Sequence, residues 1–422
     1  MKPDSRWADD PLLAGLEVYR VGGAVRDRLL GRAPAENDFV VVGASPAELE
    51  RRGFRAVGRD FPVFLHPETG EEFALARTER KSGRGYAGFV FHTGPDVGLT
   101  DDLRRRDLTI NAIAEDRNGR LIDPFGGRDD LDAGVLRHVS DAFVEDPLRL
   151  IRLARFATRL ADFRIAPETM TLARRLVASG EVDHLVAERV WQETARALMH
   201  DRPSRFFEVL RAAGALERIA PEIDALWGVP QAPEHHPEID TGVHTMMVLD
   251  LAASLDAPLA VRFACLVHDL GKPLTPAGQL PRHHGHEKRG LKPIGRVCQR
   301  LRVPNDCRDL GLIVGEHHLV CHRALELRGS TVVRMFHRLD AFRRPERFER
   351  FLLACECDRR GREGRADEPY PQAAFLQRAL AAARAIGAAA LKRRGLSGKA
   401  LGEALDAERA AAVARVRESH TG

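Results

Sequence analysis

The stretch VGGAVRDRLLGRAPAENDFVVV, residues 21–42, places two glycines and a short helical segment between two apolar runs. The runs Val18–Val21 and Phe39–Val42 are short and rich in β-branched residues, which predicts strands. Between them, Ala24–Leu30 predicts a helix that begins directly after a tight Gly-Gly turn. A third strand is predicted over Glu72–Ala76. The chain therefore begins with a mixed α/β unit.

Beyond this unit the hydrophobic spacing becomes helical. Apolar residues recur every three or four positions from 148 onward, and residues 189–199 and 206–216 predict further amphipathic helices. Residues 228–240 hold three prolines and predict a linker, whereas 372–418 predicts an Ala/Arg-rich helix. We predict an α+β chain in four parts: an α/β head over 1–140, a helical neck and body over 141–228, an all-helical domain over 229–365, and a helical tail over 366–422.

Composition excludes several classes of protein. The chain of 422 residues is 44% hydrophobic, so it can build several cores, and it lacks a run of 18 apolar residues that would span a membrane. No signal peptide is expected, and no C-x-x-C pair occurs among the six cysteines, so a reducing cytoplasm is predicted. The net charge of +4 arises from 65 basic and 61 acidic residues and does not indicate a partner by itself.

The first candidate site combines a phosphate-binding turn with paired acids. Backbone amides at Gly23 and the guanidinium of Arg26 can bind phosphate oxygens, although most Gly-Gly turns before a helix have no ligand. Glu36 and Asp38 are two residues apart at the start of a strand. Glu72 begins the strand predicted over Glu72–Ala76 and could supply a third catalytic carboxylate, although a surface acid is an equal alternative. Carboxylates this close repel one another unless a cation such as Mg²⁺ lies between them, but an isolated E-x-D is more often a polar loop end.

Two further basic segments follow. DDLRRRDLTIN (101–111) contains Arg106 and Asp107, and DPFGG (123–127) predicts a turn that serves as a hinge between domains. EDPLRLIRLARF (145–156) predicts a helix with one charged face, formed by Asp146, Arg149, Arg152 and Arg155. Each pattern alone is also typical of a solvated helix face.

The second candidate site is a region rich in histidine. Eleven of the 17 histidines lie between residues 235 and 337. LVHDLGK (266–272) places His268 beside Asp269, and His244 lies upstream on another predicted helix. Adjacent imidazole and carboxylate groups can form a compact site for a divalent metal. More histidines follow, at positions 283, 284, 286, 317 and 318.

Together, and in this order, these motifs resemble the class II tRNA nucleotidyltransferases, the CCA-adding enzymes. The similarity also includes RHVSDAFVEDPLR and HPEIDTGVHT, and it covers most of the chain. The sequence most resembles bacterial members of the family that carry a C-terminal HD phosphohydrolase domain. The resemblance implies a polymerase-beta-like nucleotidyltransferase head, in which the 3′-hydroxyl of tRNA attacks the α-phosphate of CTP or ATP and releases pyrophosphate.

The resemblance also implies roles for individual residues. Glu36 and Asp38 would hold Mg²⁺. Asp146 and Arg149 would select the incoming base, since a carboxylate and a guanidinium complement the edges of C and A but not those of G and U. The remaining nucleotide-binding residues would be Gly23, Arg26, Arg106, Asp107, Arg152 and Arg155.

Two features distinguish this chain within the family. The usual pattern is D-x-D, but Glu36 stands at the first position and extends the carboxylate by one methylene. Residues 77–100 are rich in glycine and basic residues and predict a mobile loop. Family members that add only CC lack a flexible loop in this region, so the loop favours addition of the terminal A as well.

For the histidine-rich region, the resemblance implies an HD phosphohydrolase. Its metal ligands would be His244, His268, Asp269 and, on a later helix, Asp358. Leu319 occupies a position where related sequences can carry an acid. The implied activities are phosphatase, 2′-nucleotidase and 2′,3′-cyclic phosphodiesterase, with a divalent transition metal for which Ni²⁺ is one candidate. The alternative is an inactive site whose fold still helps to bind tRNA.

The leading prediction is template-independent addition of CCA to tRNA in the cytoplasm. The predicted partners are tRNA, CTP and ATP, with no membrane, in a monomer or homodimer. The alternatives of similar chemistry are a poly(A) polymerase and an enzyme that adds only CC or only A. A different class of alternative is a metal phosphohydrolase whose head only binds RNA.

Overall fold

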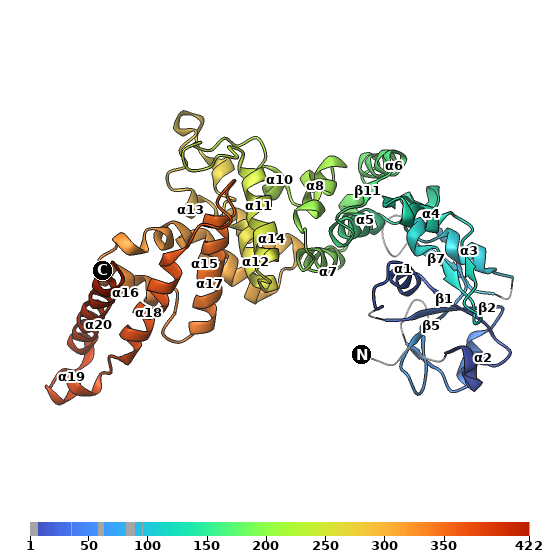
Figure 1. The fold of residues 1–422 in the computed structure, drawn as a ribbon, viewed down its shortest axis with the longest axis horizontal. Coiled ribbons are helices and arrows are strands. Elements are labelled where there is room, and N and C mark those ends of the chain that lie inside the picture. The colour runs from blue at the N-terminus through green and yellow to red at the C-terminus, as the bar shows by residue number, and fades with distance from the viewer. Residues whose placement is uncertain (1–6, 35, 58–62, 82–88, 95, 422) are drawn as a thin grey trace. The chain divides into compact units, whose positions relative to one another are not determined.

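A computed structural model describes residues 7–34, 36–57, 63–81, 89–94 and 96–421. The chain divides into two compact units, each of which is described separately below (Figure 1). The first comprises Met1–Glu193 and Glu208–Arg218, and the second comprises Thr194–Phe207 and Ile219–Gly422. The first unit is built on a sheet, whereas the second is helical in its described residues.

The first unit begins with a seven-stranded mixed sheet whose strand order is β3-β4-β5-β2-β1-β8-β9. At its centre β2 pairs antiparallel with β1 and parallel with β5. The strands are β1 (Glu17–Val21), β2 (Asp38–Val42), β3 (Arg55–Val57), β4 (Val63–Leu65), β5 (Glu72–Leu75), β8 (Ala114–Glu115) and β9 (Leu121–Ile122). The three strands predicted from the sequence therefore lie side by side in the centre of the sheet.

Apolar side chains cover both faces of this sheet. On one face Phe39 of β2 stacks on Phe73 of β5, with ring centroids 4.5 Å apart. On the other face Val21 and Val40 pack with Leu103. The surrounding helices are α1 (Gly23–Leu29), α2 (Pro46–Arg51), α3 (Leu99–Arg104) and α4 (Gly127–Asp132). Because the apolar residues of β1 and β2 are buried on both faces, the two strands hold the turn after β1 and Asp38 at the start of β2 in fixed positions.

The segment predicted to be a mobile loop contains a hairpin. Strands β6 (Thr78–Lys81) and β7 (Phe89–His92) pair antiparallel as a separate two-stranded sheet. The prediction of a loop is therefore wrong for these strands, and residues 82–88 and 95 lie outside the described residues. Basic and glycine residues dominate the segment, and they concealed the strand pattern of FVFH at 89–92.

The predicted hinge at DPFGG lies within the first unit and caps a helix. Both carboxylate oxygens of Asp123 accept hydrogen bonds, from the backbone amides of Gly127 and Arg128 at 2.8 Å each. A Cβ atom on Gly127 would lie 2.2 Å from the carbonyl oxygen of Thr109, so only glycine fits this position. The turn fixes the start of α4 rather than joining two units.

Helices complete the first unit. Helix α5 (Leu148–Arg159) is buried along almost its whole length, and its Arg152 is half-buried. Helix α6 (Pro167–Ala178) also belongs to this unit, whereas α7 (Ala187–Leu198) and α8 (Ser204–Ala212) each have residues in both units. The amphipathic segments predicted at 189–199 and 206–216 match α7 and α8 with shifts of a few residues.

The second unit is a stack of helices around α12, α15 and α17 (Figure 1). Its helices are α10 (Pro221–Asp224), α11 (Thr241–Ser254), α12 (Leu259–Val267), α13 (His286–Arg289), α14 (Leu291–Leu301), α15 (Asn305–His322), α16 (Gly329–Arg338), α17 (Pro345–Arg360), α18 (Pro371–Ala385), α19 (Ala389–Arg393) and α20 (Gly398–Thr421). The proline-rich segment 228–240 is not a free linker, because Gln231 is buried and Asp240 caps α11.

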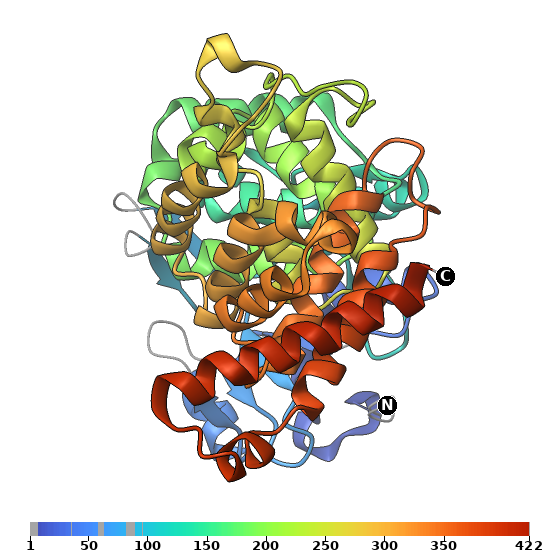
Figure 2. The same ribbon diagram turned by 90° about the vertical axis from the view of Figure 1, so that its left-hand side faces the viewer.

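The predicted tail helix is divided into three helices. The segment 386–388 separates α18 from α19, and glycines at 395 and 398 with φ of +81° and +55° separate α19 from α20. Figure 2 shows α20 as the long dark red helix that ends at the C-terminus, and it packs on α16 and α18. Pro371–Arg393 meets the length and composition of a membrane span, but Phe375, Leu376 and Ala379 bury one of its faces.

Candidate functional site

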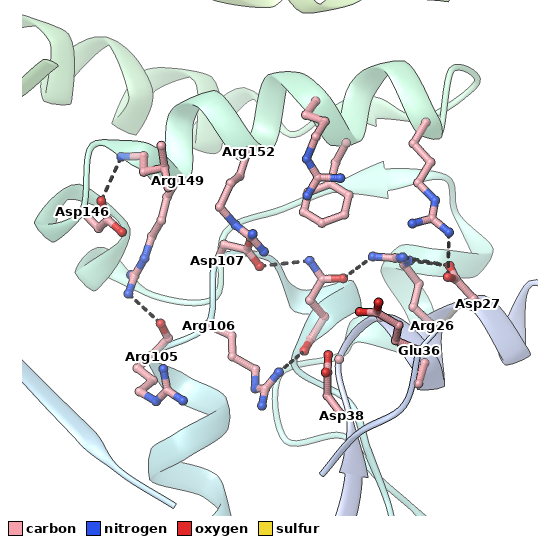
Figure 3. Close-up of a pocket in the computed structure, with 18 of the residues that line it drawn as sticks. Arg26, Asp27, Glu36, Asp38, Arg105, Arg106, Asp107, Asp146, Arg149 and Arg152 are labelled. Carbon is pink, nitrogen blue, oxygen red and sulfur yellow. Dashed lines mark hydrogen bonds and ion pairs between the residues drawn. The ribbon is translucent and has the colours of Figure 1, made fainter. Parts of the chain in front are cut away.

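A cavity of about 530 Å³ opens in the first unit where the sheet meets α5 (Figure 3). Its lining residues include nine arginines and five acidic residues. Of the predicted residues, the lining holds Gly23, Arg26, Glu36, Asp38, Arg106, Asp107, Asp146, Arg149, Arg152 and Arg155. This excess of guanidinium groups around a few carboxylates suits a polyanion that is accompanied by cations.

The Gly-Gly turn lets a guanidinium approach the backbone. Gly22 has φ of +69°, and a Cβ atom there would lie 2.9 Å from Nη1 of Arg106. The positive φ requires glycine here, and the absence of a side chain leaves room for the guanidinium of Arg106. Gly23 begins α1 directly after this turn and faces the cavity.

The acids lie at one end of the central strands. Asp38 begins β2, where it lies opposite Glu72 of β5 in the parallel register, and Glu36 precedes the strand. Glu36 and Asp38 line the cavity, whereas Glu72 lies beside it. Partial burial raises the pKa of Asp38, and Glu36 adds to this shift while Arg106 opposes it. Burial, Asp38 and Glu36 likewise raise the pKa of Glu72.

Burial is the largest cause of both shifts, and repulsion by the neighbouring acids adds to it. A raised pKa means that ionisation costs more free energy than for an ordinary carboxyl, so the protein compensates the charges of Asp38 and Glu72 incompletely. Oxygen atoms of this kind are the ligands that Mg²⁺ prefers. The arrangement therefore fits a divalent cation.

A chain of hydrogen bonds connects α1 to α5 across the floor of the cavity (Figure 3). Nη1 of Arg26 donates to Oδ1 of Asn111 at 2.6 Å, and Nδ2 of Asn111 donates to Oδ1 of Asp107 at 3.0 Å. Nε of Arg152 then donates to Oδ2 of Asp107 at 2.7 Å. Burial alone would raise the pKa of Asp107, but Arg152 and the hydrogen bonds hold it well below its ordinary value.

The environment of Arg26 differs from that expected for a phosphate-binding side chain. Arg26 is only 2% exposed. Its Nε and Nη2 donate to Asp27 at 3.0 and 2.8 Å, while Nη1 binds Asn111. Arg159 donates to the other oxygen of Asp27 at 2.7 Å. All three nitrogens of Arg26 therefore bind protein atoms.

Asp102 is a residue of the site that the sequence reasoning missed. Its carboxylate is fully buried and accepts hydrogen bonds from Arg105 at 2.7 and 3.0 Å and from Arg106 at 3.1 Å. Burial would raise its pKa, but the two arginines outweigh burial and lower it. The spacing of three and four residues along α3 is the signal that could have identified it.

The residues expected to select the base lie at the start of α5. Oδ1 of Asp146 accepts a hydrogen bond from the backbone amide of Leu148 at 2.9 Å. The guanidinium of Arg149 donates to the carbonyl oxygens of Ala142 and Arg105, at 2.7 Å each. Both side chains are therefore anchored by the backbone and lie at the edge of the cavity (Figure 3).

A second cavity, of about 550 Å³, lies in the helical unit. The four predicted residues of the histidine-rich region converge beside it, and Asp269 and Asp358 line the cavity itself. Nε2 of His244 lies 3.1 Å from Oδ1 of Asp358, and Nε2 of His268 lies 3.6 Å from the same oxygen. Oδ2 of Asp269 lies 3.1 Å from Nε2 of His268 and 4.0 Å from Nε2 of His244. All four side chains are buried.

Outer contacts fix the orientation of these groups. Nδ1 of His244 lies 2.9 Å from Oε1 of Glu238, and Nδ1 of His268 lies 2.8 Å from the carbonyl oxygen of Cys265. The other oxygen of Asp358 lies 2.7 Å from Nε2 of His322. Glu238 and His322 were not identified from the sequence, because Glu238 lay in the predicted linker and His322 follows the EHH motif without a distinguishing pattern.

The charges of this cluster favour a cation. Burial would lower the pKa of His268, but Asp269 and Asp358 outweigh burial and raise it to about 10. The same interactions lower the pKa of both carboxylates despite burial. Two ionised carboxylates and two imidazoles with fixed orientation form a donor set that suits a divalent transition metal.

The other histidines of the region separate into two groups. His286 and His318 lie near Oδ1 of Asp269, at 3.3 and 3.9 Å from their Nε2 atoms. In contrast, His283 contacts Thr275 and the carbonyl oxygen of Pro230, and His284 is exposed on the rim of the cavity. His317 lies beside Glu316, and Leu319 is 39% exposed.

Comparison with known families divides the chain into three segments. Residues 18–137 match the Poly A polymerase head domain, and residues 162–226 match the probable RNA and SrmB-binding site of polymerase A. Residues 241–359 match the HD domain. The first cavity draws most of its lining from the first segment, and the second cavity lies largely within the third.

Several curated proteins are similar over almost the full length. The multifunctional CCA protein of Chromobacterium violaceum is 60% identical over 403 residues, which cover 96% of this chain and 99% of that protein. The multifunctional CCA protein of Halorhodospira halophila is 59% identical over 409 residues, with the same coverage of both chains.

Solved structures show the same fold at lower identity. The CCA-adding enzyme of Bacillus stearothermophilus in complex with CTP has a TM-score of 0.63 and 24% identity, covering 96% of this chain and 91% of that one. The Thermotoga maritima CCA-adding enzyme complexed with tRNA has a TM-score of 0.62 and 20% identity, with the same coverage.

Proposed function

The chain belongs to the family of multifunctional CCA proteins, and from this membership we propose how its two sites divide the work. The head site adds C, C and A to the 3′ ends of tRNA from CTP and ATP. The helical site hydrolyses phosphate esters. The observation that carries the first activity is the cavity in which Glu36 and Asp38 face a wall of arginines.

In the head, Glu36 and Asp38 hold Mg²⁺, and Glu72 contributes negative charge from the neighbouring strand. Burial and the neighbouring acids raise the pKa of Asp38 and of Glu72, which supports this assignment, because a bound cation would stabilise the ionised carboxylates. Mg²⁺ supplies stabilisation of the attacking and leaving oxygens during phosphoryl transfer. The backbone at Gly23 and the guanidinium of Arg106 bind the triphosphate on the opposite side.

The arginines that line the cavity divide into two functional groups. Arg106 and Arg152 remain partly accessible, with side chains 18% and 34% exposed, and contact the nucleotide. Arg26 and Arg155 are positioning residues, because Arg26 is bound by Asp27 and Asn111, and Arg155 forms a buried ion pair with Glu193. Asp107 acts near the ribose and also orients Arg152.

Base selection depends on Asp146 and Arg149. Their anchoring by backbone groups holds a carboxylate acceptor and a guanidinium donor in fixed positions without a nucleic-acid template. Cytosine and adenine both present an exocyclic amine beside a ring acceptor and can satisfy this pair. Guanine and uracil present the opposite arrangement and leave buried polar groups unpaired.

The helical site holds a divalent transition metal through His244, His268, Asp269 and Asp358, with Ni²⁺ as one candidate. Its ligand set supports hydrolysis of phosphate esters, and the expected activities are phosphatase, 2′-nucleotidase and 2′,3′-cyclic phosphodiesterase. Lys272, whose Nζ lies 2.6 Å from Oδ2 of Asp269, is placed to bind a substrate phosphate. These reactions would repair damaged tRNA ends before CCA is added.

The setting of both activities follows from the family. The enzyme acts in the cytoplasm on tRNA with CTP and ATP, as a monomer or homodimer. We assign nucleotidyl transfer to 1–140, base selection and RNA contact to 141–228, hydrolysis to 229–365 and a structural tail to 366–422. The match of residues 162–226 to an RNA-binding family supports the second assignment.

The test uses the full chain, Mg²⁺ and tRNA transcripts that end before CCA or at CC. Labelled CTP and ATP are supplied separately and together, and products are resolved at single-nucleotide resolution. Addition of C, C and A followed by arrest is expected. A long A ladder would support a poly(A) polymerase instead, and products limited to CC or to A would contradict a complete CCA activity.

Two variants separate the sites. Asp38→Ala should abolish incorporation and retain hydrolysis of a 2′,3′-cyclic phosphate, whereas His268→Ala should do the reverse. Incorporation that survives Asp38→Ala would overturn the assignment of the head site and favour a hydrolase with an RNA-binding head.

A further inference from the structure

We propose that Phe156 is a positioning residue of the head site, whose aromatic ring holds the guanidinium groups of Arg26, Arg152 and Arg155 through cation–π contacts. Phe156 lies on α5 and lines the first cavity, and it is 4% exposed. The inference rests on the proposed nucleotidyl transfer. It adds to that reaction a residue that acts with neither a charge nor a hydrogen bond.

Three arginines surround this ring. The Cζ atom of Arg155 lies 4.4 Å from the ring centroid, and those of Arg26 and Arg152 lie 5.1 and 5.6 Å from it. A cation is attracted to an aromatic ring within about 6 Å of the centroid, because the face of the ring carries partial negative charge. All three guanidinium groups are therefore close enough to be attracted by the same ring.

The arginines reach the ring from two helices. Arg26 belongs to α1 and Arg152 to α5 (Figure 3), and Arg155 directly precedes Phe156 in the sequence. A spacing of four residues places Arg152 beside Phe156 on the surface of α5. The ring therefore connects the helix that follows the Gly-Gly turn with the helix that carries the charged wall of the cavity.

Each of the three guanidinium groups is also held at its edge by a carboxylate. The ion pairs, with their nitrogen–oxygen distances, are Arg26–Asp27 (2.8 Å), Arg152–Asp107 (2.7 Å) and Arg155–Glu193 (2.5 Å). The N–H bonds of a guanidinium lie in its plane, so hydrogen bonds act only at its edge. An aromatic ring attracts the face instead, and it restricts the rotation that contacts at the edge still allow.

A neutral ring suits this site better than another acid. Burial is the largest cause that lowers the pKa of Arg26 and of Arg155. Arg159 adds to the first shift and Arg152 to the second, whereas the partner acids oppose them. A further carboxylate would stabilise these cations but would repel an incoming triphosphate. The ring stabilises them and leaves the positive charge of the wall available to phosphate groups.

A role in packing alone is the alternative. Leu150, Ile151 and Leu153 pack α5 without aromatic rings and are fully buried. The two roles have different requirements, because packing depends on the shape of the side chain, whereas cation–π attraction depends on the electron density of the ring. Fluorine withdraws electron density from the ring and changes its shape little. Fluorination therefore separates the two roles.

The test introduces phenylalanine with one, two or three ring fluorines at position 156 of the full chain. Incorporation from labelled CTP, and separately from ATP, is measured with Mg²⁺ on tRNA transcripts that end before CCA or at CC. We expect kcat/KM for both nucleotides to fall with each added fluorine, by about 10-fold over the series. The preference for CTP over UTP should not change, because backbone groups rather than the ring anchor Asp146 and Arg149.

The same fluorinated series at Phe64 is the matched control. Phe64 is fully buried in an apolar cluster of the same unit, and among the described residues no arginine lies over its ring. Its fluorination should leave kcat/KM unchanged. Circular dichroism verifies folding, and the monofluorinated protein replaces the trifluorinated one at either position if the latter is unfolded.

The outcomes distinguish this inference from the function on which it rests. A kcat/KM that stays constant across the series at position 156, or that falls equally in the series at position 64, would overturn the role of the ring. Absence of incorporation by the unmodified protein would instead overturn the proposed nucleotidyl transfer.

Discussion

Asn111 is predicted to couple the two halves of the nucleotide site. Its side chain accepts from Arg26 at 2.6 Å and donates to Asp107 at 3.0 Å, and it is 5% exposed. Asn111→Ala removes both hydrogen bonds and leaves a buried guanidinium and a buried carboxylate with one partner fewer each. Asp107 would also hold Arg152 less firmly.

The size of the effect follows from the charges of the partners. A hydrogen bond to a charged group contributes about 1.5–3 kcal/mol, so loss of two costs at most about 3–6 kcal/mol. Because Asn111 lines a water-filled cavity, water can replace part of this, and we expect a loss of about 3 kcal/mol in unfolding free energy. We expect kcat/KM for CTP to fall about 10- to 100-fold, because Arg152 loses its fixed orientation.

Urea unfolding of the full chain in a Trp227→Phe background measures the stability. The remaining tryptophans, Trp7 and Trp191, both belong to the first unit, so their fluorescence reports the unit that contains Asn111. Asn118→Ala, in an exposed turn, is the matched control and should change stability by less than about 0.5 kcal/mol. An Asn111→Ala effect no larger than that of the control would refute the proposed coupling.

Three further outcomes are expected. Because the pKa of Asp38 is raised, its carboxylate becomes protonated at a higher pH than an ordinary aspartate. Nucleotide incorporation should therefore decline as the pH falls, and the decline should begin above the pH range in which ordinary carboxylates titrate. A higher Mg²⁺ concentration should move this decline to lower pH. A pH profile that does not depend on Mg²⁺ would contradict the role of Asp38 as a ligand. Glu238→Gln weakens the acceptor that orients Nδ1 of His244 and should lower metal affinity about 10- to 100-fold in competition titrations. Ser204→Ala removes a hydroxyl that donates to Asp250 at 2.7 Å and should cost about 1 kcal/mol in urea unfolding, against no measurable cost for the exposed Ser254→Ala.

The sequence was sufficient where local chemistry determines the structure. The Gly-Gly turn between an apolar strand and a helix predicts its own conformation, because Gly22 requires a positive φ. Strand residues at 39–42 are apolar on both faces and were identified for that reason. The same holds for the helix after Pro147, whose buried face is visible in the spacing of apolar residues.

Where tertiary contacts determine the role of a residue, the sequence was insufficient. Arg26 was expected to bind phosphate, but whether its guanidinium is free depends on Asn111, which is 85 residues away. Segment 228–240 has the composition of a linker, yet it supplies Glu238 to the metal site because the chain folds back on α11. No periodicity in these segments indicates such contacts.

The position of Glu36 explains how the chain can tolerate an acid longer than the aspartate of the family pattern. Asp38 is held in register, opposite Val21 of β1 and Glu72 of β5, so its carboxylate has a fixed origin. Glu36 precedes β2, so its backbone lies outside the register in which β2 pairs with β1 and β5. Its extra methylene can therefore be absorbed by a small backbone displacement outside the sheet. Asp38→Glu would move a carboxylate whose backbone is held by two neighbouring strands, so under the proposed function we expect it to lower incorporation, whereas Glu36 is accommodated.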